Sequence, residues 1–148
     1  MASTFDPKGR NFMENAMDKV MEYLKQAKGA WYLATVEDGQ PRVRPFGAQV
    51  VYNGRLYIQT SNKKKVYAQL KAEPRFEICA FIDGGKWMRL SGKAVEDTSR
   101  DAKVAMLDAN PGLKRMYSAD DDKTAVFYIE EGTADFCSFT APAETVKL

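Results

Sequence analysis

Apolar and polar positions recur along this chain in two periods, one typical of helices and one typical of strands. Over residues 11–28 the apolar side chains are spaced by three or four positions, which predicts an amphipathic helix that ends at Gly29. Shorter runs rich in β-branched and aromatic residues predict strands. We expect these strands at residues 31–36, 41–52, 55–60, 75–83 and 86–96, and a final hairpin over residues 124–139 that turns at Glu131 and Gly132.

Turn signals and helix ends divide the rest of the chain. Asp38-Gly39 and Asn53-Gly54 are tight-turn pairs, so the first three strands are expected to form an antiparallel meander. Further helices are predicted at residues 63–72, from about 98 to 110, and at 113–117. Residues 118–123 are predicted to form an exposed loop, and the tail 140–148 has little pattern.

About seven short strands with few helices favour a mainly β fold, an antiparallel sheet that closes into a barrel with flanking helices. Several strands are apolar on both faces, as expected if helices or a partner subunit cover the outside of the barrel. The length of 148 residues and the absence of a linker predict a single domain over residues 1–148.

Composition narrows the class of protein. The 22 basic and 20 acidic residues nearly balance, giving a net charge of +2, which argues against a nucleic-acid-binding protein. No apolar run approaches the length of a membrane span, and the N-terminus lacks a signal-peptide core, so a cytoplasmic protein with no membrane partner is expected. Cys79 and Cys137 lie in apolar strand-like runs and are predicted to be buried, unreactive free thiols.

The chain contains no histidine. This excludes imidazole-based metal sites and nucleophile pairs that use histidine as the base. We expect no metal site, and a catalytic role would draw its chemistry from a bound organic cofactor.

Basic residues are placed where they could bind an anion. Thr60, Ser61 and the lysines at 63–65 lie between a predicted strand and the start of a helix, where backbone N–H groups and the helix dipole favour a phosphate. Arg42 and Arg44 share one face of their strand, and Pro45 predicts an edge strand or an interruption there. The plainer alternative is that these lysines and arginines are only solvated surface residues.

The segment WYLATVEDGQPRVRPFGAQVVYNGRLYIQTSNKKKVYAQLKAEPRFEICAF resembles the FMN-binding split-barrel family related to pyridoxamine 5'-phosphate oxidase. The resemblance rests on the order of an LAT strand, an Asp-Gly turn, a P-x-x-R-P-like strand, a hairpin, a Thr-Ser-x-Lys segment and a Pro-Arg-Phe strand. The resemblance extends through KWMRLSGKAVE and the closing hairpin. The small size of the chain is more like that of the general-stress and nitroimidazole-reductase-like members.

The resemblance implies a homodimeric split β-barrel with FMN at the subunit interface. Residues near the flavin ring and ribityl chain would be Arg42, Val43, Arg44, Pro45 and Gln59. The phosphate would be held by Thr60, Ser61, Lys64 and Lys65. Trp87 and Arg89 would reach the cofactor from across the dimer, and Arg44 or Arg89 would stabilise the reduced flavin electrostatically.

The implied activity is that of an oxidoreductase which transfers a hydride through flavin N5 to or from a small organic substrate; no catalytic side chain is assigned. Oxidation of pyridoxamine phosphate is not expected, because the chain lacks the C-terminal extension of the vitamin B6 oxidases. Haem degradation and the histidine-dependent nitroimidazole reductions lose support for want of a histidine. Two alternatives stay open: a non-catalytic flavin- or nucleotide-binding module, and a β-barrel that serves only protein interaction.

Overall fold

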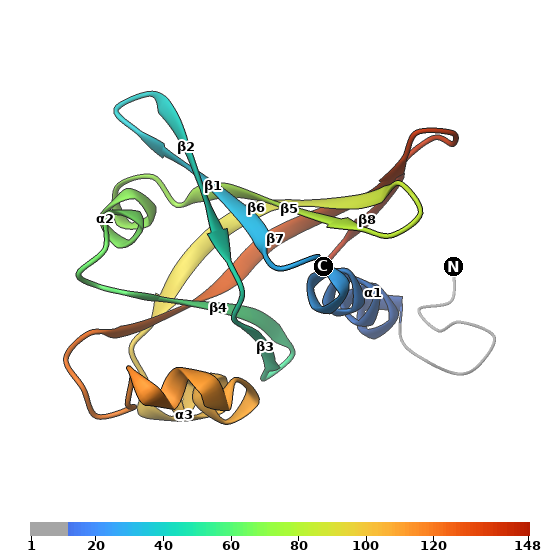
Figure 1. Ribbon diagram of the computed structural model, residues 1–148. Coiled ribbons are helices and arrows are strands. Elements are labelled where there is room, and N and C mark those ends of the chain that lie inside the picture. The colour runs from blue at the N-terminus through green and yellow to red at the C-terminus, as the bar shows by residue number, and fades with distance from the viewer. Residues whose placement is uncertain (1–11) are drawn as a thin grey trace, which may run out of the picture.

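Eight antiparallel strands and three α-helices make up the part of the chain that the computed structural model describes, residues 12–148 (Figure 1). The helices are α1 (Phe12–Gln26), α2 (Lys65–Ala72) and α3 (Arg100–Ala109), followed by a 3₁₀ turn, η1 (Pro111–Arg115). The strands are β1 (Trp31–Glu37), β2 (Gln40–Phe46), β3 (Gln49–Tyr52), β4 (Arg55–Ser61), β5 (Arg75–Ile82), β6 (Lys86–Asp97), β7 (Thr124–Ser138) and β8 (Glu144–Lys147).

The sheet follows the order β2-β1-β5-β6-β7-β4-β3, with β8 added to β7. The predicted strand over residues 41–52 is therefore wrong as one element. It is interrupted at Gly47 and Ala48, after which β2 pairs with β1 and β3 pairs with β4. The predicted three-stranded meander is also wrong, because the two hairpins lie at opposite ends of the sheet. Pro45, which has no N–H to donate, lies near this interruption on the terminal strand β2, as predicted.

The prediction of a final hairpin over residues 124–139 is also wrong. Residues 124–138 form one long strand along β6, where a hairpin was expected. The register passes from Ser91 opposite Thr133 to Lys93 opposite Glu130, so β7 carries an extra residue at this point. Glu131 there has φ of 55°, so the apparent turn signal marks a β-bulge. Strand β8, in the tail where no element was predicted, pairs with β7 from residues 144 to 147.

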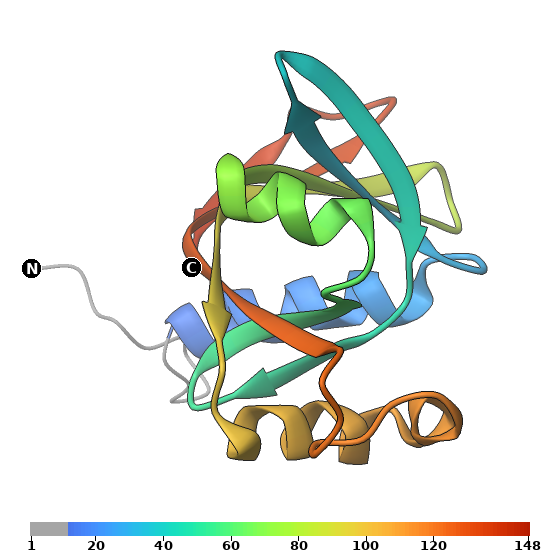
Figure 2. The same cartoon turned by 90° about the vertical axis from the view of Figure 1, so that its left-hand side faces the viewer.

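The three helices close different parts of the barrel. Helix α1 packs on β5, β6 and β8, and its Tyr23 ring lies 5.1 Å from that of Phe136 in the main core. Helix α2 bridges β1 and β4, and α3 packs on β3, β4 and β7. Both views show β4 running between α2 and α3 (Figures 1 and 2). Strands β2 and β3 are not paired with each other, so the barrel is open between them, near β4.

These elements confirm the expected mainly β antiparallel barrel with flanking helices. The helix predicted at residues 11–28 is confirmed from Phe12, and residue 11 lies outside the described residues. The short helix expected at 113–117 is the 3₁₀ turn η1, two residues earlier. No helix within the described residues is long and apolar enough to cross a membrane.

The prediction for the cysteines is half wrong. Strand β5 alternates strictly between buried and exposed positions, and Cys79 falls in the exposed set, whereas Cys137 on β7 is buried. Cys79 pairs with Tyr32 of β1 on the same outward face, and Tyr32 is 48% exposed. The two residues next to Cys79 in sequence, Ile78 and Ala80, point inward and do not shield it.

Candidate ligand-binding site

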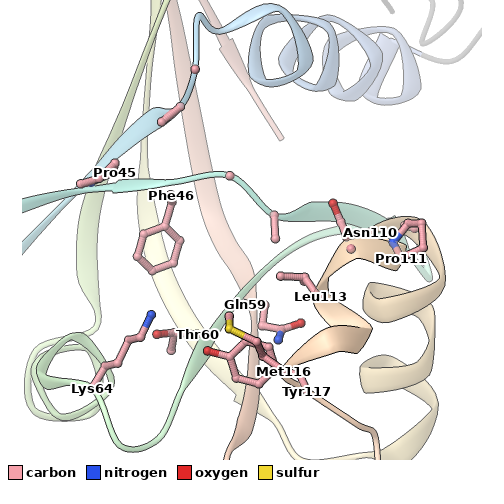
Figure 3. Close-up of a pocket in the computed structure, with 16 residues that line it drawn as sticks. Pro45, Phe46, Gln59, Thr60, Lys64, Asn110, Pro111, Leu113, Met116 and Tyr117 are labelled. Carbon is pink, nitrogen blue, oxygen red and sulfur yellow. The ribbon is translucent and has the colours of Figure 1, made fainter.

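A cavity of about 720 Å³ opens where the end of β2 faces β4 and the loop after α3. We call it the larger cavity. Most of its wall is apolar or backbone, and Lys64 is the one charged lining residue among those that the structure describes. In Figure 3, Phe46 points into the cavity and Lys64 extends its ammonium group toward Thr60. Its walls come from Gly29, Ala30, Pro45, Phe46, Gly47, Ala48, Gln59, Thr60, Lys64, Ala109, Asn110, Pro111, Gly112, Leu113, Met116 and Tyr117.

The larger cavity has a buried polar floor on β4. Gln59 is 6% and Thr60 5% exposed, and both line the cavity. Among the described residues, neither the nitrogen nor the oxygen of the Gln59 amide has a hydrogen-bond partner, and nor does the Thr60 hydroxyl. Buried polar groups without partners are costly and rare in folded proteins. These three atoms are therefore available to a ligand that presents both a donor and an acceptor.

A second, smaller cavity of about 420 Å³ lies between β2 and the start of α2. Lys64 lines both cavities, so they are neighbours on either side of this residue. From the described part of the chain, four cationic side chains and one carboxylate, that of Glu37, face the smaller cavity, and this excess of positive charge favours an anion. Its lining residues are Glu37, Arg42, Val43, Arg44, Lys64, Lys65, Val66 and Gln69.

Backbone groups and the Ser61 and Asn62 side chains hold the segment before α2 in place, and its lysine side chains take no part in these bonds. The Ser61 hydroxyl accepts a hydrogen bond from the Lys63 N–H at 3.1 Å, and Asn62 bonds through its N–H and its side chain to the carbonyls of Lys123 and Asp122. No side chain caps α2 at Lys64. Among the described side chains, from residue 16 onward, neither Lys64 nor Lys65 makes an ion pair.

Two charged groups of the smaller cavity, those of Arg44 and Glu37, have pKa values below their usual ones. Burial lowers the pKa of the half-buried Arg44 guanidinium. The hydrogen bond from Gln69, aided by Arg42 3.5 Å away, lowers the pKa of Glu37. At neutral pH both groups carry full charge, and Glu37 already has Gln69 and Arg42 as partners. A ligand anion would therefore meet the unpaired lysines first.

The structure brings most of the predicted site residues together. Arg42, Val43, Arg44, Lys64 and Lys65 line the smaller cavity, and Pro45, Gln59, Thr60 and Lys64 line the larger one.

Three predicted residues lie elsewhere within this chain. Ser61 is buried at the end of β4 and lines neither cavity. Trp87 packs against Phe139 at 4.9 Å, and Arg89 lies 3.7 Å from Asp135, both on the outward face of β6.

The sequence alone missed two groups of lining residues. Leu113, Met116 and Tyr117, after α3, reach the larger cavity only because α3 packs beneath β3. Gln69 follows Lys65 by four positions, which puts both on one face of α2, and this spacing was the available signal. Glu37, at the end of β1, had no comparable signal.

The fold and the cavities together define a protein class: an antiparallel barrel, open between two terminal strands, with a cation-rich pocket beside a polar-floored cavity. The chain belongs to the pyridoxamine 5'-phosphate oxidase family, whose sequence profile matches residues 17–139. The resemblance noted from the sequence is thus confirmed, and the fold is the split barrel of this family. A search of curated proteins finds no match to the chain.

Solved structures place the chain more closely within the family. It is 44% identical to a NimC/NimA family protein from Clostridium acetobutylicum, with a TM-score of 0.86 over 90% of this chain and 93% of that one. General stress protein 26 from Bacillus anthracis is 16% identical, with a TM-score of 0.71 over 90% and 99% of the two chains. A pyridoxamine 5'-phosphate oxidase-related, FMN-binding protein from Nostoc punctiforme is 11% identical, with a TM-score of 0.55 over 92% and 96%.

Proposed function

We propose that this protein binds FMN across the two cavities and acts as an FMN-dependent oxidoreductase on a small organic substrate. The observation that carries the proposal is that the two cavities are neighbours, since Lys64 lines both of them. The smaller cavity is cationic, and the larger cavity has a largely apolar wall and the unpaired Gln59 amide on its floor. FMN has the matching order of groups, with a phosphate at one end and a flat ring bearing carbonyl and N–H groups at the other.

The residues fit the phosphate at the smaller cavity. Lys64, Lys65, Arg42 and Arg44 supply the positive charge, and the uncapped start of α2 adds backbone N–H groups. Glu37 opposes an anion, but its partners Arg42 and Gln69 offset part of its charge. A dianionic phosphate would thus be attracted by four cations against one partly neutralised carboxylate.

The residues also fit the ring at the larger cavity. The Gln59 amide can donate to a carbonyl and accept from an N–H, and the Thr60 hydroxyl can do either. Pro45 and Phe46 supply apolar surface at the end of β2, and Leu113 and Met116 do so across from them. The volume of about 720 Å³ leaves room beside a ring for a second small molecule.

When bound, FMN supplies hydride acceptance and donation, so the protein itself needs no acid or base for that step. The task of this chain is to hold the cofactor, to exclude water with Phe46, Leu113 and Met116, and to leave one side accessible. Arg44 lines the phosphate side, which favours a role there over one at the ring.

We further propose that the functional unit is a homodimer. The outward face of β1, β5 and β6 exposes Tyr32 (48%) and Phe81 (50%), and Phe139, 79% exposed, packs on Trp87 beside them. Exposed aromatic residues gathered on one sheet face favour a protein interface. Pairing through this face would give Trp87 and Arg89 access to the partner's cofactor, the role that the family resemblance implies for them.

The test is a titration of flavin fluorescence with FMN and with riboflavin, which lacks the phosphate. Lys64→Ala/Lys65→Ala should weaken FMN binding on the order of a hundredfold, because each charge-assisted bond contributes about 1.5–3 kcal/mol, and should leave riboflavin nearly unchanged. Lys63→Ala is the matched control, since Lys63 lines neither cavity. Equal FMN affinity in the double variant and the control would refute the phosphate assignment.

A second measurement separates an oxidoreductase from a non-catalytic flavin carrier. The FMN-loaded protein should oxidise a reduced nicotinamide in the presence of a nitroaromatic or quinone acceptor. A protein that binds FMN tightly but shows no turnover with such donors would support the carrier instead.

A further inference from the structure

Thr35, Arg44 and Gln69 form a hydrogen-bonded group between β1, β2 and α2, which we call the Gln69 clamp. The Gln69 side-chain oxygen accepts from the Thr35 hydroxyl at 2.5 Å and from Arg44 Nη2 at 2.5 Å. Arg44 Nη1 donates to the Thr35 hydroxyl at 2.7 Å and to the Leu33 carbonyl at 3.2 Å. Thr35 and Gln69 are 2% and 5% exposed, so the bond between them is buried, and the bonds from the half-buried Arg44 are partly buried.

Glu37 fixes which way the Gln69 amide faces. The Gln69 Nε2 group donates to the Glu37 carboxylate at 3.1 Å, which leaves Oε1 for Thr35 and Arg44. With the amide reversed, an NH₂ group would face the Arg44 guanidinium and an oxygen would face a carboxylate, and both contacts would be repulsive. The amide therefore has one stable orientation, and Arg44 has one position against it.

The clamp ties α2 to the β2 side of the barrel. The opposite flank of the helix is held by Tyr67 and Lys71, which both donate to Glu96 of β6, and Val66 and Leu70 enter the core. Gln69 provides the matching side-chain bonds toward β1 and β2.

Gln69 and Lys65 are four positions apart on α2, and both line the smaller cavity. A shift of the helix at Gln69 therefore also moves Lys65, and Lys64 just before it.

We propose that the Gln69 clamp is a positioning device, which sets α2 against β2 so that Lys64 and Lys65 converge with Arg42 on one phosphate. This deepens the proposed function and depends on it. Arg44 acts in the clamp through its directional N–H groups as well as through its charge. Most of its donors are committed to protein acceptors, so its main effect on a phosphate is indirect.

The decisive variant is Thr35→Val. Thr35 lines neither cavity and carries no charge, so a ligand contact cannot explain its effect. Valine keeps the shape, and Gln69 and Arg44 each keep another partner, so the variant should fold. Thr35→Val removes both the bond from Thr35 to Gln69 and the bond from Arg44 to Thr35, so FMN affinity should fall at least about threefold, the factor expected for the loss of one neutral hydrogen bond. Riboflavin affinity should stay within about twofold of wild type, because the ring is not held by α2.

Two further variants remove competing explanations. Thr145→Val deletes a threonine hydroxyl that bonds to Asp135 on the β7–β8 pair, away from both cavities, and should change neither affinity. Arg44→Lys keeps the charge but cannot bridge Thr35, Gln69 and the Leu33 carbonyl at once, so the preference for FMN over riboflavin should fall here too. A wild-type preference in Arg44→Lys would mean that charge alone suffices, and would overturn the proposal.

A double-mutant cycle locates the effect at the lysines. If Thr35 acts by positioning them, Thr35→Val should lose most of its effect on FMN affinity in a Lys64→Ala/Lys65→Ala background. Additive effects, or equal losses of FMN and riboflavin binding in Thr35→Val, would show a merely structural role. If the wild type itself shows no preference for FMN over riboflavin, the proposed function fails, and this outcome is distinct from failure of the clamp.

Discussion

The loop over residues 118–123 depends on one carboxylate, that of Asp121. Its two oxygens accept from the backbone N–H groups of Ser118 (2.9 Å), Lys123 (3.1 Å) and Thr124 (2.7 Å), and from the Thr124 hydroxyl (2.8 Å). Asp121→Asn keeps one oxygen, which can serve Lys123 and Thr124. It replaces the oxygen facing the Ser118 N–H with an NH₂ group, so that donor loses its partner.

The expected cost follows from these contacts. A hydrogen bond to a charged group contributes about 1.5–3 kcal/mol net, and an unsatisfied donor adds to the loss. We expect Asp121→Asn to lower the free energy of unfolding by about 2–3 kcal/mol at pH 7. Asp122→Asn is the matched control, because within the described residues the Asp122 carboxylate makes no hydrogen bond and only its backbone carbonyl accepts one, from Asn62; its cost should stay within about 0.5 kcal/mol.

The same contacts make this stability depend on pH. Burial alone would raise the pKa of Asp121, but the hydrogen bonds from Ser118, Thr124 and Lys123 outweigh it and hold that pKa well below its usual 3.8. A carboxyl whose pKa is lower in the folded state stabilises the fold above its unfolded pKa and ceases to do so as pH falls through the folded value. The gap between wild type and Asp121→Asn should therefore be full at pH 7 and shrink below about pH 4.

Urea unfolding at pH 7 and at pH 3 checks both statements. Equal stability of Asp121→Asn and Asp122→Asn at pH 7 would refute the reasoning, and so would a gap that is unchanged at pH 3. Because Asn62 bonds to the carbonyls of Lys123 and Asp122, loosening this loop should also weaken FMN binding in the folded variant.

Two other changes test the bulge and the outward face. Gly92→Ala should lower the free energy of unfolding by about 1–3 kcal/mol, because the added Cβ would lie 2.9 Å from the Glu130 carbonyl oxygen. Gly112→Ala is the control and should lower it little, because a Cβ there meets nothing within 4 Å. Equal losses in the two variants would contradict the close approach of β6 and β7. Sedimentation should show a dimer in which Cys79 reacts slowly with a thiol reagent, and Phe81→Glu should give monomers with fast-reacting Cys79. A wild type that sediments as a monomer would exclude pairing through this face.

Much of the local structure could be read from the sequence. The three-to-four spacing in α1, the apolar run of β5 and the polar start of α3 near Thr98 depend on near neighbours, and those elements lie where they were predicted, apart from one or two residues at their ends. The hydroxyls and lysines before a helix start were an equally local signal. That residues 42–45 would lie near them was implied only by the family resemblance, because no local pattern joins the two segments; in the structure Arg42, Val43, Arg44, Lys64 and Lys65 line one cavity.

The partners of each strand were decided only by the tertiary structure. Residues 41–52 look like one strand, but β2 hydrogen-bonds to β1 and β3 to β4, at opposite ends of the sheet. The Glu131-Gly132 pair has the composition of a turn, yet it forms a bulge because β6 continues alongside on both sides of it. Periodicity tells which side of a strand is buried, whereas pairing depends on residues distant in the sequence.

The candidate site, too, was predicted in part from local sequence features and decided in part by tertiary contacts. The sequence supplied the cationic residues of the smaller cavity, because charge and helix position are local properties. It could not supply the clamp partners of Gln69, the unpaired Gln59 amide or the wall from Leu113 to Tyr117. Each of these arises where segments at least 25 residues apart in the chain come into contact, and only the packing of α2 and α3 against the barrel decides those contacts.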